Sequence, residues 1–111
     1  MCGIAGFVDV AGGPSADGEV LARAMAAPLV ARGPDDDGAW SDGHVGLGFR
    51  RLAIVDLSPH GHQPMHSPSR RFTLVFNGEI YNHGALRSEL ASAGVRFRGR
   101  SDTEVVVAAI E

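Results

Sequence analysis

Met1-Cys2-Gly3-Ile4-Ala5-Gly6-Phe7-Val8 opens the chain and places its only cysteine next to a strand-forming pattern. The apolar side chains after Cys2 predict a strand over residues 3–10, which would hold the N-terminus in a sheet. Methionine is usually removed when the next residue is small, so we expect Cys2 to become the first residue of the mature chain. Its free α-amine, with a pKa of about 7.8, would then accept the thiol proton. The alternative is an incidental cysteine close to a terminus.

Composition and charge exclude several classes of function. The 111 residues suffice for one domain with a modest core, and 44% apolar with 21% charged residues is typical of a soluble globular protein. A net charge of −3 indicates neither nucleic acid nor an anionic membrane as a partner. A single cysteine allows no internal disulfide, and the first apolar run is too short for a signal peptide or a membrane span. We therefore expect a cytoplasmic protein.

Helical and strand periodicities occur in turn along the chain and predict the α+β class. Leu21, Met25 and Leu29 recur every four residues, so we expect them to form the buried face of a helix. Asp42-Gly43 between two strand-forming runs predicts a hairpin, and Ser-Asp-Thr-Glu at 101–104 fits a capping box. The predicted elements are a strand over 3–10, a helix over 17–27, strands over 39–41, 44–49 and 71–76, a helix over 82–93, a strand over 95–98 and a helix after residue 101.

Two clusters of residues have side chains that could bind a metal. The carboxylates of Asp35 to Asp37 suggest either a cation site or a solvated acidic loop over residues 32–38. We predict the loop, because the run lacks the spaced ligands of a calcium-binding loop. His60, His62 and His66 also have a spacing that could suit a metal, but no cysteine or carboxylate completes the set. The sequence therefore predicts no metal site.

Six short segments occur in the order and spacing of one family. They are Met-Cys-Gly-Ile-Ala-Gly at 1–6, Arg-Gly-Pro-Asp at 32–35, Arg-Arg-Leu-Ala-Ile-Val-Asp-Leu at 50–57, Gln-Pro-Met at 63–65, Phe-Asn-Gly-Glu-Ile-Tyr-Asn at 76–82 and Ser-Asp-Thr-Glu at 101–104. Together they make the chain resemble the glutamine-hydrolysing domain of asparagine synthetases of the bacterial B type. Such domains are class II glutamine amidotransferases, within the N-terminal-nucleophile hydrolases. One departure is Ala31, where the family often has histidine.

The resemblance implies a four-layer αββα sandwich, of which residues 1–111 would form the N-terminal part. The last predicted helix has no stop signal before Glu111, which also indicates the front part of a longer protein. The family's synthetase domain, with its ATP-binding Ser-Gly-Gly-x-Asp-Ser signature, does not occur in these residues. ATP and magnesium would bind only in that domain, so we expect no cofactor here. The implied partners are L-glutamine, the synthetase domain and, as a further candidate, a second copy in a homodimer.

The resemblance also assigns a role to each group that glutamine would need. Cys2 would attack the side-chain amide, and Asn77 with Gly78 would form the oxyanion hole. Arg51 would hold the α-carboxylate, because a guanidinium makes two parallel charge-assisted bonds that lysine cannot reproduce. Arg51 is preferred to Arg50 because it directly precedes Leu-Ala-Ile-Val, as in the family's pattern. The remaining substrate-binding residues would be Leu52, Ala53, Ile54 and Val55 through their backbone, and Glu79 and Asp102 at the α-ammonium group.

The resulting prediction is a domain that hydrolyses glutamine through an N-terminal cysteine thioester. It would supply ammonia for ATP-dependent asparagine synthesis from aspartate. One alternative keeps this chemistry and changes the acceptor, as in amidotransferases of exopolysaccharide or dipeptide-amide synthesis. Another alternative is a catalytically silent fragment that binds amino acids or protein partners.

Overall fold

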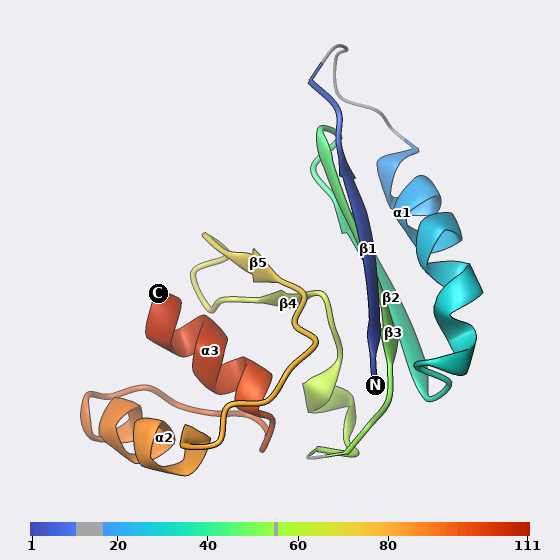
Figure 1. The fold of residues 1–111 in the computed structure, drawn as a ribbon. Helices are drawn as coiled ribbons and strands as arrows, with labels where there is room; N and C mark the ends of the chain where they lie inside the picture. The colour runs from blue at the N-terminus through green and yellow to red at the C-terminus, as the bar shows by residue number, and fades with distance from the viewer. Residues whose placement is uncertain (11–16, 55) are drawn as a thin grey trace.

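The computed structural model describes residues 1–10, 17–54 and 56–111, which form two parts joined by the segment after β3 (Figure 1). The first part contains β1 (Gly3–Val8), α1 (Gly18–Ala26), the 3-10 helix η1 (Ala27–Ala31), β2 (Asp36–Ser41) and β3 (Val45–Arg51). The second part contains the 3-10 helix η2 (Pro59–Gly61), β4 (Met65–His66), β5 (Thr73–Leu74), α2 (His83–Ser92) and α3 (Asp102–Ile110). Antiparallel sheets together with helices confirm the predicted α+β class.

The first sheet has β3 at its centre, paired antiparallel with β1 on one side and β2 on the other. Gly3 is opposite Arg50 in the register, so Cys2 precedes β1 beside the end of β3. The strand predicted over residues 3–10 is confirmed from Gly3 to Val8. The sheet therefore fixes the cysteine next to the last residue of the central strand.

The hairpin between β2 and β3 turns at Asp42-Gly43, as predicted. Gly43 has a φ of 98°, a conformation that favours glycine. The Asp42 carboxylate accepts hydrogen bonds from the backbone N–H groups of Val45 and His44, at 2.7 and 2.8 Å. These two bonds hold the pKa of Asp42 below its usual value. The turn is thus specified by its own side chains.

Helix α1 packs on the sheet through small residues and not through the predicted apolar stripe. The residues that it buries are Gly18, Ala22 and Ala26. Leu21 and Met25, which were expected in the core, are 49% and 39% exposed. The cause is the glycine-rich face of β3: a Cβ on Gly48 would lie 2.3 Å from the carbonyl oxygen of Ala22. At this short separation only small side chains fit between helix and sheet.

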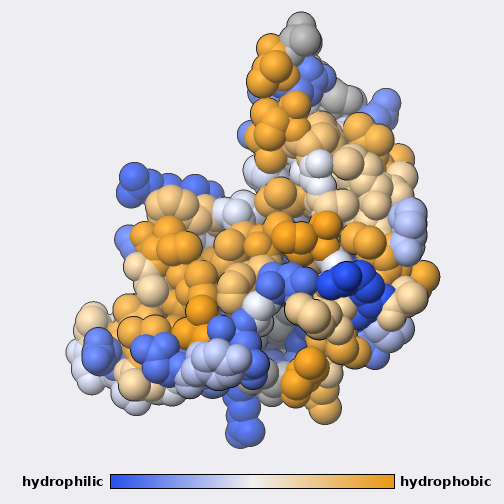
Figure 2. Space-filling model, viewed as in Figure 1, coloured by the Kyte–Doolittle hydropathy of each residue, from blue (hydrophilic) through white to orange (hydrophobic). Residues whose placement is uncertain are grey.

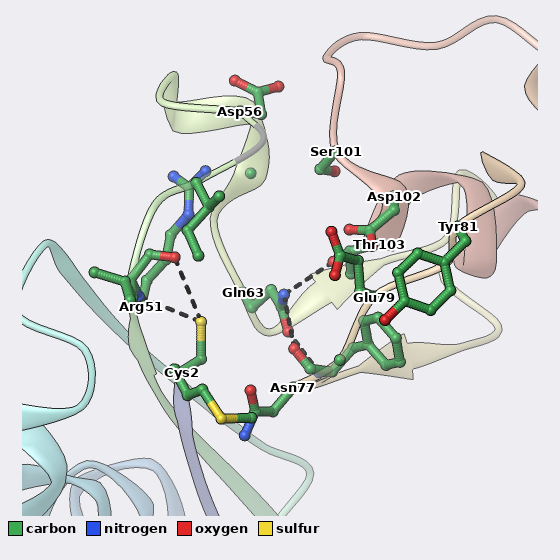
Figure 3. Close-up of a pocket in the computed structure, with 16 residues that line it drawn as sticks. Cys2, Arg51, Asp56, Gln63, Asn77, Glu79, Tyr81, Ser101, Asp102 and Thr103 are labelled. Atoms are coloured by element: carbon green, nitrogen blue, oxygen red, sulfur yellow. Dashed lines mark hydrogen bonds between the residues drawn. The ribbon is translucent and has the colours of Figure 1, made fainter. Parts of the chain in front are cut away.

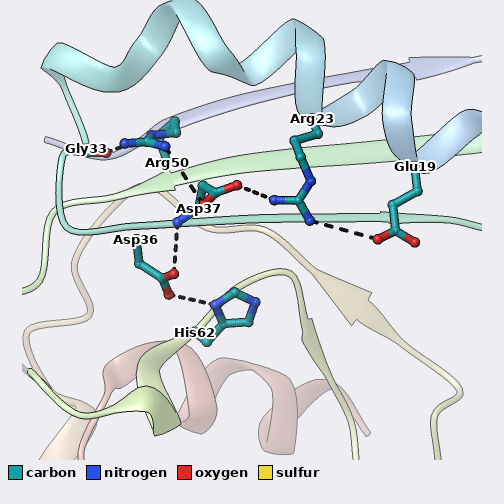
Figure 4. Close-up of polar contacts among 7 residues, drawn as sticks. All are labelled: Glu19, Arg23, Gly33, Asp36, Asp37, Arg50 and His62. Carbon is teal, nitrogen blue, oxygen red and sulfur yellow. Dashed lines mark hydrogen bonds and ion pairs between the residues drawn. The ribbon is translucent and has the colours of Figure 1, made fainter.

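The predicted acidic loop over residues 32–38 is wrong for its second half, which is the start of β2. Asp37 is opposite Arg50 in the register, and its carboxylate also pairs with Arg23 of α1 (Figure 4). Asp36 pairs with His62, with 2.6 Å between Oδ2 and Nδ1. Opposite charges across neighbouring strands stabilise the pairing. The acidic run can therefore continue a strand because the carboxylates of Asp36 and Asp37 both have side-chain partners.

Strand β5 is shorter than the strand predicted over residues 71–76. It covers Thr73–Leu74 and pairs with β4. Beyond it, the backbone of Phe76 hydrogen-bonds to the side-chain amide of Gln63, at 2.6 and 3.3 Å. A side chain thus replaces the partner strand where the predicted strand would have continued.

Residues 95–98, predicted as a strand, form an irregular segment between α2 and α3. The Glu104 carboxylate accepts hydrogen bonds from the backbone N–H groups of Arg98 and Gly99, at 2.6 and 2.9 Å. Because a side chain satisfies these donors, the segment needs no neighbouring strand. The capping box is confirmed in one half only. Ser101 accepts from the N–H of Glu104 at 3.2 Å, whereas the Glu104 carboxylate holds the loop.

The face of the first sheet that α1 does not cover is partly apolar. Ile4 and Val8 of β1 are 47% and 67% exposed. Figure 2 shows apolar surface over β1 and over the second part on the same side of the molecule. Within residues 1–10, 17–54 and 56–111, no helix has the length and apolar character needed to cross a membrane.

Candidate active site

A cavity of about 380 Å³ lies where the two parts meet. Its walls include the two residues before β1, the segment after β3, the turn after β5 and the first turn of α3. The predicted site residues that line it are Cys2, Arg51, Leu52, Ile54, Asn77, Gly78, Glu79 and Asp102 (Figure 3). Ala53 is not among the lining residues, and Val55 lies outside the described residues. Segments up to a hundred positions apart in the sequence therefore meet at one cavity.

The thiol of Cys2 is held by the backbone of Leu52. The Leu52 N–H donates to Sγ at 3.3 Å, and the thiol donates to the Leu52 carbonyl oxygen at 3.6 Å. On the other side, Nε of Arg32 donates to the carbonyl oxygen of Cys2 at 3.3 Å. Met1 also lines the cavity, so its removal would leave the α-amine of Cys2 at the cavity wall. The half-buried thiol is thus fixed by main-chain contacts.

The two arginines that end β3 point to opposite sides of the sheet, as neighbouring strand residues do. Arg51 is 8% exposed and lines the cavity, and its Nη1 donates to the carbonyl oxygen of Ser58 at 2.9 Å. A guanidinium has several N–H donors, so this bond leaves others for an anion. Arg50 instead donates from Nε to the carbonyl oxygen of Gly33 at 2.9 Å. Of the two arginines, only Arg51 faces the cavity.

The Arg-Gly-Pro-Asp segment at 32–35 supports the wall that carries Cys2 and Arg51. The Asp35 N–H donates to the carbonyl oxygen of Arg51 at 2.9 Å. The Asp35 carboxylate accepts from the N–H of Ala53 at 2.8 Å. This bond directs the Ala53 N–H to Asp35, while the residues on either side of Ala53 line the cavity. The segment therefore fixes the main chain on both sides of Leu52.

The opposite wall supplies an amide and two carboxylates. Asn77 is half-buried, and Figure 3 shows its side chain extending to the side of the cavity where Cys2 lies. Gly78 and Glu79 are exposed. Asp102 is 7% exposed, and its Oδ2 accepts from the N–H of Ile80 at 2.9 Å. Asp102 lies in the first turn of α3, where the helix dipole stabilises a negative charge.

Comparison with known sequences decides the family. The model of the glutamine amidotransferase domain matches residues 1–111. The chain belongs to the glutamine amidotransferase domain family.

Among curated relatives, the glutamine-hydrolyzing asparagine synthetase 1 of Bacillus subtilis is 46% identical over 109 residues, which cover 97% of this chain and 17% of that protein. Amidase chry2 of Gibberella zeae is 42% identical over 118 residues, which cover 97% of this chain and 17% of that protein. A putative glutamine-hydrolyzing asparagine synthetase of Mycobacterium tuberculosis is 40% identical over 122 residues, which cover 97% of this chain and 19% of that protein. The chain thus spans less than a fifth of the length of these relatives.

The cavity of this amidotransferase domain is also lined by buried polar residues that the sequence did not single out as site residues. They are Asp56, Gln63, Ser101 and Thr103. Each lies inside one of the short family-like segments. That membership was the only sequence feature that could have pointed to these residues as part of the site. Nothing in a single sequence distinguishes the members of such a segment that face a cavity from those that do not.

Asp56 connects the segment after β3 with the loop before α3. Its Oδ1 accepts hydrogen bonds from the hydroxyl and the N–H of Ser58, and its Oδ2 accepts from the N–H of Arg100 at 2.6 Å. The Ser58 hydroxyl and the Arg100 N–H contribute most to lowering the pKa of Asp56 to about 2, and the Arg51 charge adds to them. Asp56 is therefore ionised at neutral pH and joins two walls of the cavity.

The histidines considered as metal ligands make separate contacts in the amidotransferase domain. His62 pairs with Asp36, and Nδ1 of His66 hydrogen-bonds to the Thr73 hydroxyl at 3.0 Å. Burial, with a smaller contribution from Arg70, lowers the pKa of His66. Within the part of the chain that the structure describes, no group of three His, Cys, Asp or Glu side chains is arranged to hold a metal ion.

Proposed function

We propose that this domain hydrolyses L-glutamine to glutamate and ammonia, with Cys2 as the nucleophile. The observation that carries the proposal is that Cys2, Arg51, Asn77 and Asp102, from four separate segments, line one cavity. A thiol, a guanidinium, an amide and a buried carboxylate together complement an amino acid that carries a side-chain amide. Membership of the glutamine amidotransferase domain family supports the same reaction.

Substrate binding rests on opposite charges at the two walls. Arg51 binds the α-carboxylate through parallel charge-assisted hydrogen bonds. Asp102 and Glu79 bind the α-ammonium group. Asp102 contributes more than Glu79, because it is buried and its charge is less screened by water than that of the exposed Glu79. The backbone of Leu52 and Ile54 lies along the substrate between these groups.

The covalent reaction uses the α-amine that removal of Met1 exposes. This amine takes the thiol proton as Sγ of Cys2 attacks the amide carbon, and Asn77 and the N–H of Gly78 stabilise the oxyanion. The same group returns the proton to the leaving nitrogen, so ammonia departs and a γ-glutamyl thioester remains. Water then adds to the thioester with the amine as base. The C–S bond breaks, which releases glutamate and restores the thiol.

The relatives are several times longer than this chain, and their names suggest how the ammonia is used. We propose that the parent protein carries a synthetase domain that binds ATP and magnesium and makes asparagine from aspartate. The four-layer αββα sandwich belongs to the same proposal. In it, α1 and the β1-β3-β2 sheet are the first two layers, and the exposed Ile4 and Val8 pack on the second sheet.

Another ammonia acceptor is the second candidate. The 42% identity to a protein named amidase chry2 favours it, because a similar stretch of sequence is present in a protein whose name does not mention asparagine. Both candidates need the same cavity, so the two differ only in the product. Incubation of the full-length protein with glutamine, aspartate and ATP decides between them, because asparagine forms only in the first case.

Cys2→Ala in the full-length protein tests glutamine hydrolysis. We expect glutamate release to fall at least about a thousandfold, because the nucleophile is lost. Glutamine should still bind in a calorimetric titration, since Arg51 and Asp102 are unchanged. Mass spectrometry should find Met1 removed in both proteins, because alanine is as small as cysteine. Undiminished glutamate release in Cys2→Ala would refute the mechanism, and binding without turnover in the wild type would favour a silent amino-acid-binding module.

A further inference from the structure

The side chain of Gln63 connects three segments in the wall of the cavity. Gln63 is 5% exposed and lies between η2 and β4. Its Oε1 accepts from the N–H of Phe76 at 2.6 Å, and its Nε2 donates to the Phe76 carbonyl oxygen at 3.3 Å. Nε2 also donates to the hydroxyl of Thr103 at 3.1 Å. Figure 3 shows Gln63 between Cys2 on one side and Asp102 with Thr103 on the other.

The two residues that Gln63 contacts adjoin the groups proposed to act on glutamine. Phe76 directly precedes Asn77, and Thr103 directly follows Asp102. One side chain satisfies both backbone groups of Phe76, as a neighbouring strand would do. We propose that Gln63 is a positioning residue that sets the oxyanion-hole donors and the Asp102 carboxylate relative to each other. This inference rests on the proposed glutamine hydrolysis.

The chemistry of a carboxamide suits this position. It offers two N–H donors and one acceptor oxygen in a single plane, and all of them are used here. An ionised glutamate at this position would place an acceptor against the Phe76 carbonyl oxygen. The backbone of Gln63 also packs closely against β2, since a Cβ on Gly38 would lie 1.9 Å from the Gln63 carbonyl oxygen. Gln63 therefore lies directly against the sheet that positions Cys2.

Gln63→Met in the full-length protein removes the three hydrogen bonds and keeps the length of the side chain. We expect kcat to fall about 10–100-fold, because the part-buried groups of Phe76 lose their partner and Asn77 is no longer held. Backbone hydrogen exchange over residues 76–80 should become at least about tenfold faster. The exchange of the first sheet should change little, which separates positioning from a general loss of structure.

Thr103→Val is the second variant and removes only the bond on the Asp102 side. We expect KM for glutamine to rise about 3–10-fold with kcat within about twofold, because the bonds to Phe76 remain. Ser67→Ala is the matched control. Ser67 is 2% exposed, and its hydroxyl accepts from the N–H of Phe72 at 3.1 Å, outside the cavity. Its kcat and KM should equal those of the wild type.

Any one of the following results overturns the inference. One is a kcat for Gln63→Met within about twofold of the wild type. The second is an equal loss of activity in Ser67→Ala, or faster exchange throughout Gln63→Met, since either indicates a merely structural role. If Gln63→Met does not fold, the test rests on Thr103→Val, and an unchanged KM for glutamine in that variant overturns the inference. If the wild type releases no glutamate, the proposed function fails, and exchange over residues 76–80 alone decides whether Gln63 positions this segment.

Discussion

The Sγ atom of Cys2 lies within 3.3 Å of the backbone nitrogen and 3.6 Å of the carbonyl oxygen of the same residue, Leu52. Leu52 directly follows β3, so the end of the central strand positions the thiol. Because these hydrogen bonds use backbone atoms, the position of the thiol depends on the groups that hold the main chain near Leu52. The Asp35 carboxylate, which accepts from the N–H of Ala53, is one of them.

Asp35→Ala removes that acceptor without touching the cavity. We expect kcat for glutamine hydrolysis to fall about 3–10-fold. The effect is modest because Asp35 is exposed and water can replace part of the lost bond. Asp35→Asn keeps an acceptor oxygen, so the decrease in kcat for this variant should stay below about threefold. Steady-state glutamate release measures both, and equal rates for Asp35→Ala and the wild type would show that Asp35 does not support the site.

Arg51→Lys should weaken glutamine binding about 10–100-fold, because lysine cannot form the second charge-assisted bond to the α-carboxylate. Arg50→Lys is the matched control, since Arg50 donates to Gly33 and does not line the cavity. We expect its affinity to stay within about threefold of the parent. Calorimetric titration in a Cys2→Ala background measures binding without turnover. A larger effect at Arg50 than at Arg51 would reverse the assignment.

Asn77→Ala should lower kcat about 10²–10³-fold with a much smaller change in KM, as expected for a lost oxyanion donor. Asn82→Ala is a suitable control on the same segment. Asn82 is exposed directly before α2, and its side chain makes no capping hydrogen bond. Its kinetic constants should stay within about twofold of the wild type. A KM effect without a kcat effect in Asn77→Ala would place Asn77 in substrate binding.

The sequence predicted elements best where neighbouring residues decide the structure. The turn at Asp42-Gly43 and the cap at Ser101 are specified by their own side chains, and both are confirmed. The buried face of α1 could not be predicted, because the glycine face of β3 selects alanine over leucine at the contact. The strand predicted over residues 71–76 stops early because a distant side chain, Gln63, pairs with Phe76.

The same distinction applies to the candidate site. Family-like segments were enough to single out Cys2, Arg51 and Asp102, and all three line one cavity. Asp56 and Gln63 lie in such segments too, but their partners are remote in the sequence. Asp56 contacts Arg100 from 44 positions away, and Gln63 contacts Thr103 from 40 positions away. Residues that join the walls are recognised only when the walls are seen together.

Asp56→Asn should make the domain less stable in a pH-dependent way. The pKa of Asp56 is about 2 in the folded chain, below the value of about 3.9 expected when unfolded. The stabilisation by the ionised carboxylate is thus fully present above about pH 4 and is lost as the pH falls toward about 2. We expect the variant to lose about 1 kcal/mol of unfolding free energy at pH 7. The loss is smaller than the pKa shift alone implies, because a carboxamide keeps one acceptor oxygen for the donors of Ser58 or Arg100.

Urea unfolding at a series of pH values checks the prediction for Asp56. The difference in unfolding free energy between wild type and Asp56→Asn should be constant from about pH 7 to 5 and should shrink below about pH 4. Glu89→Gln is a control that removes one exposed carboxylate from α2 and should change the unfolding free energy by less than about 0.5 kcal/mol. A difference that stays constant down to the lowest pH would mean that Asp56 acts through hydrogen bonds that do not require its charge.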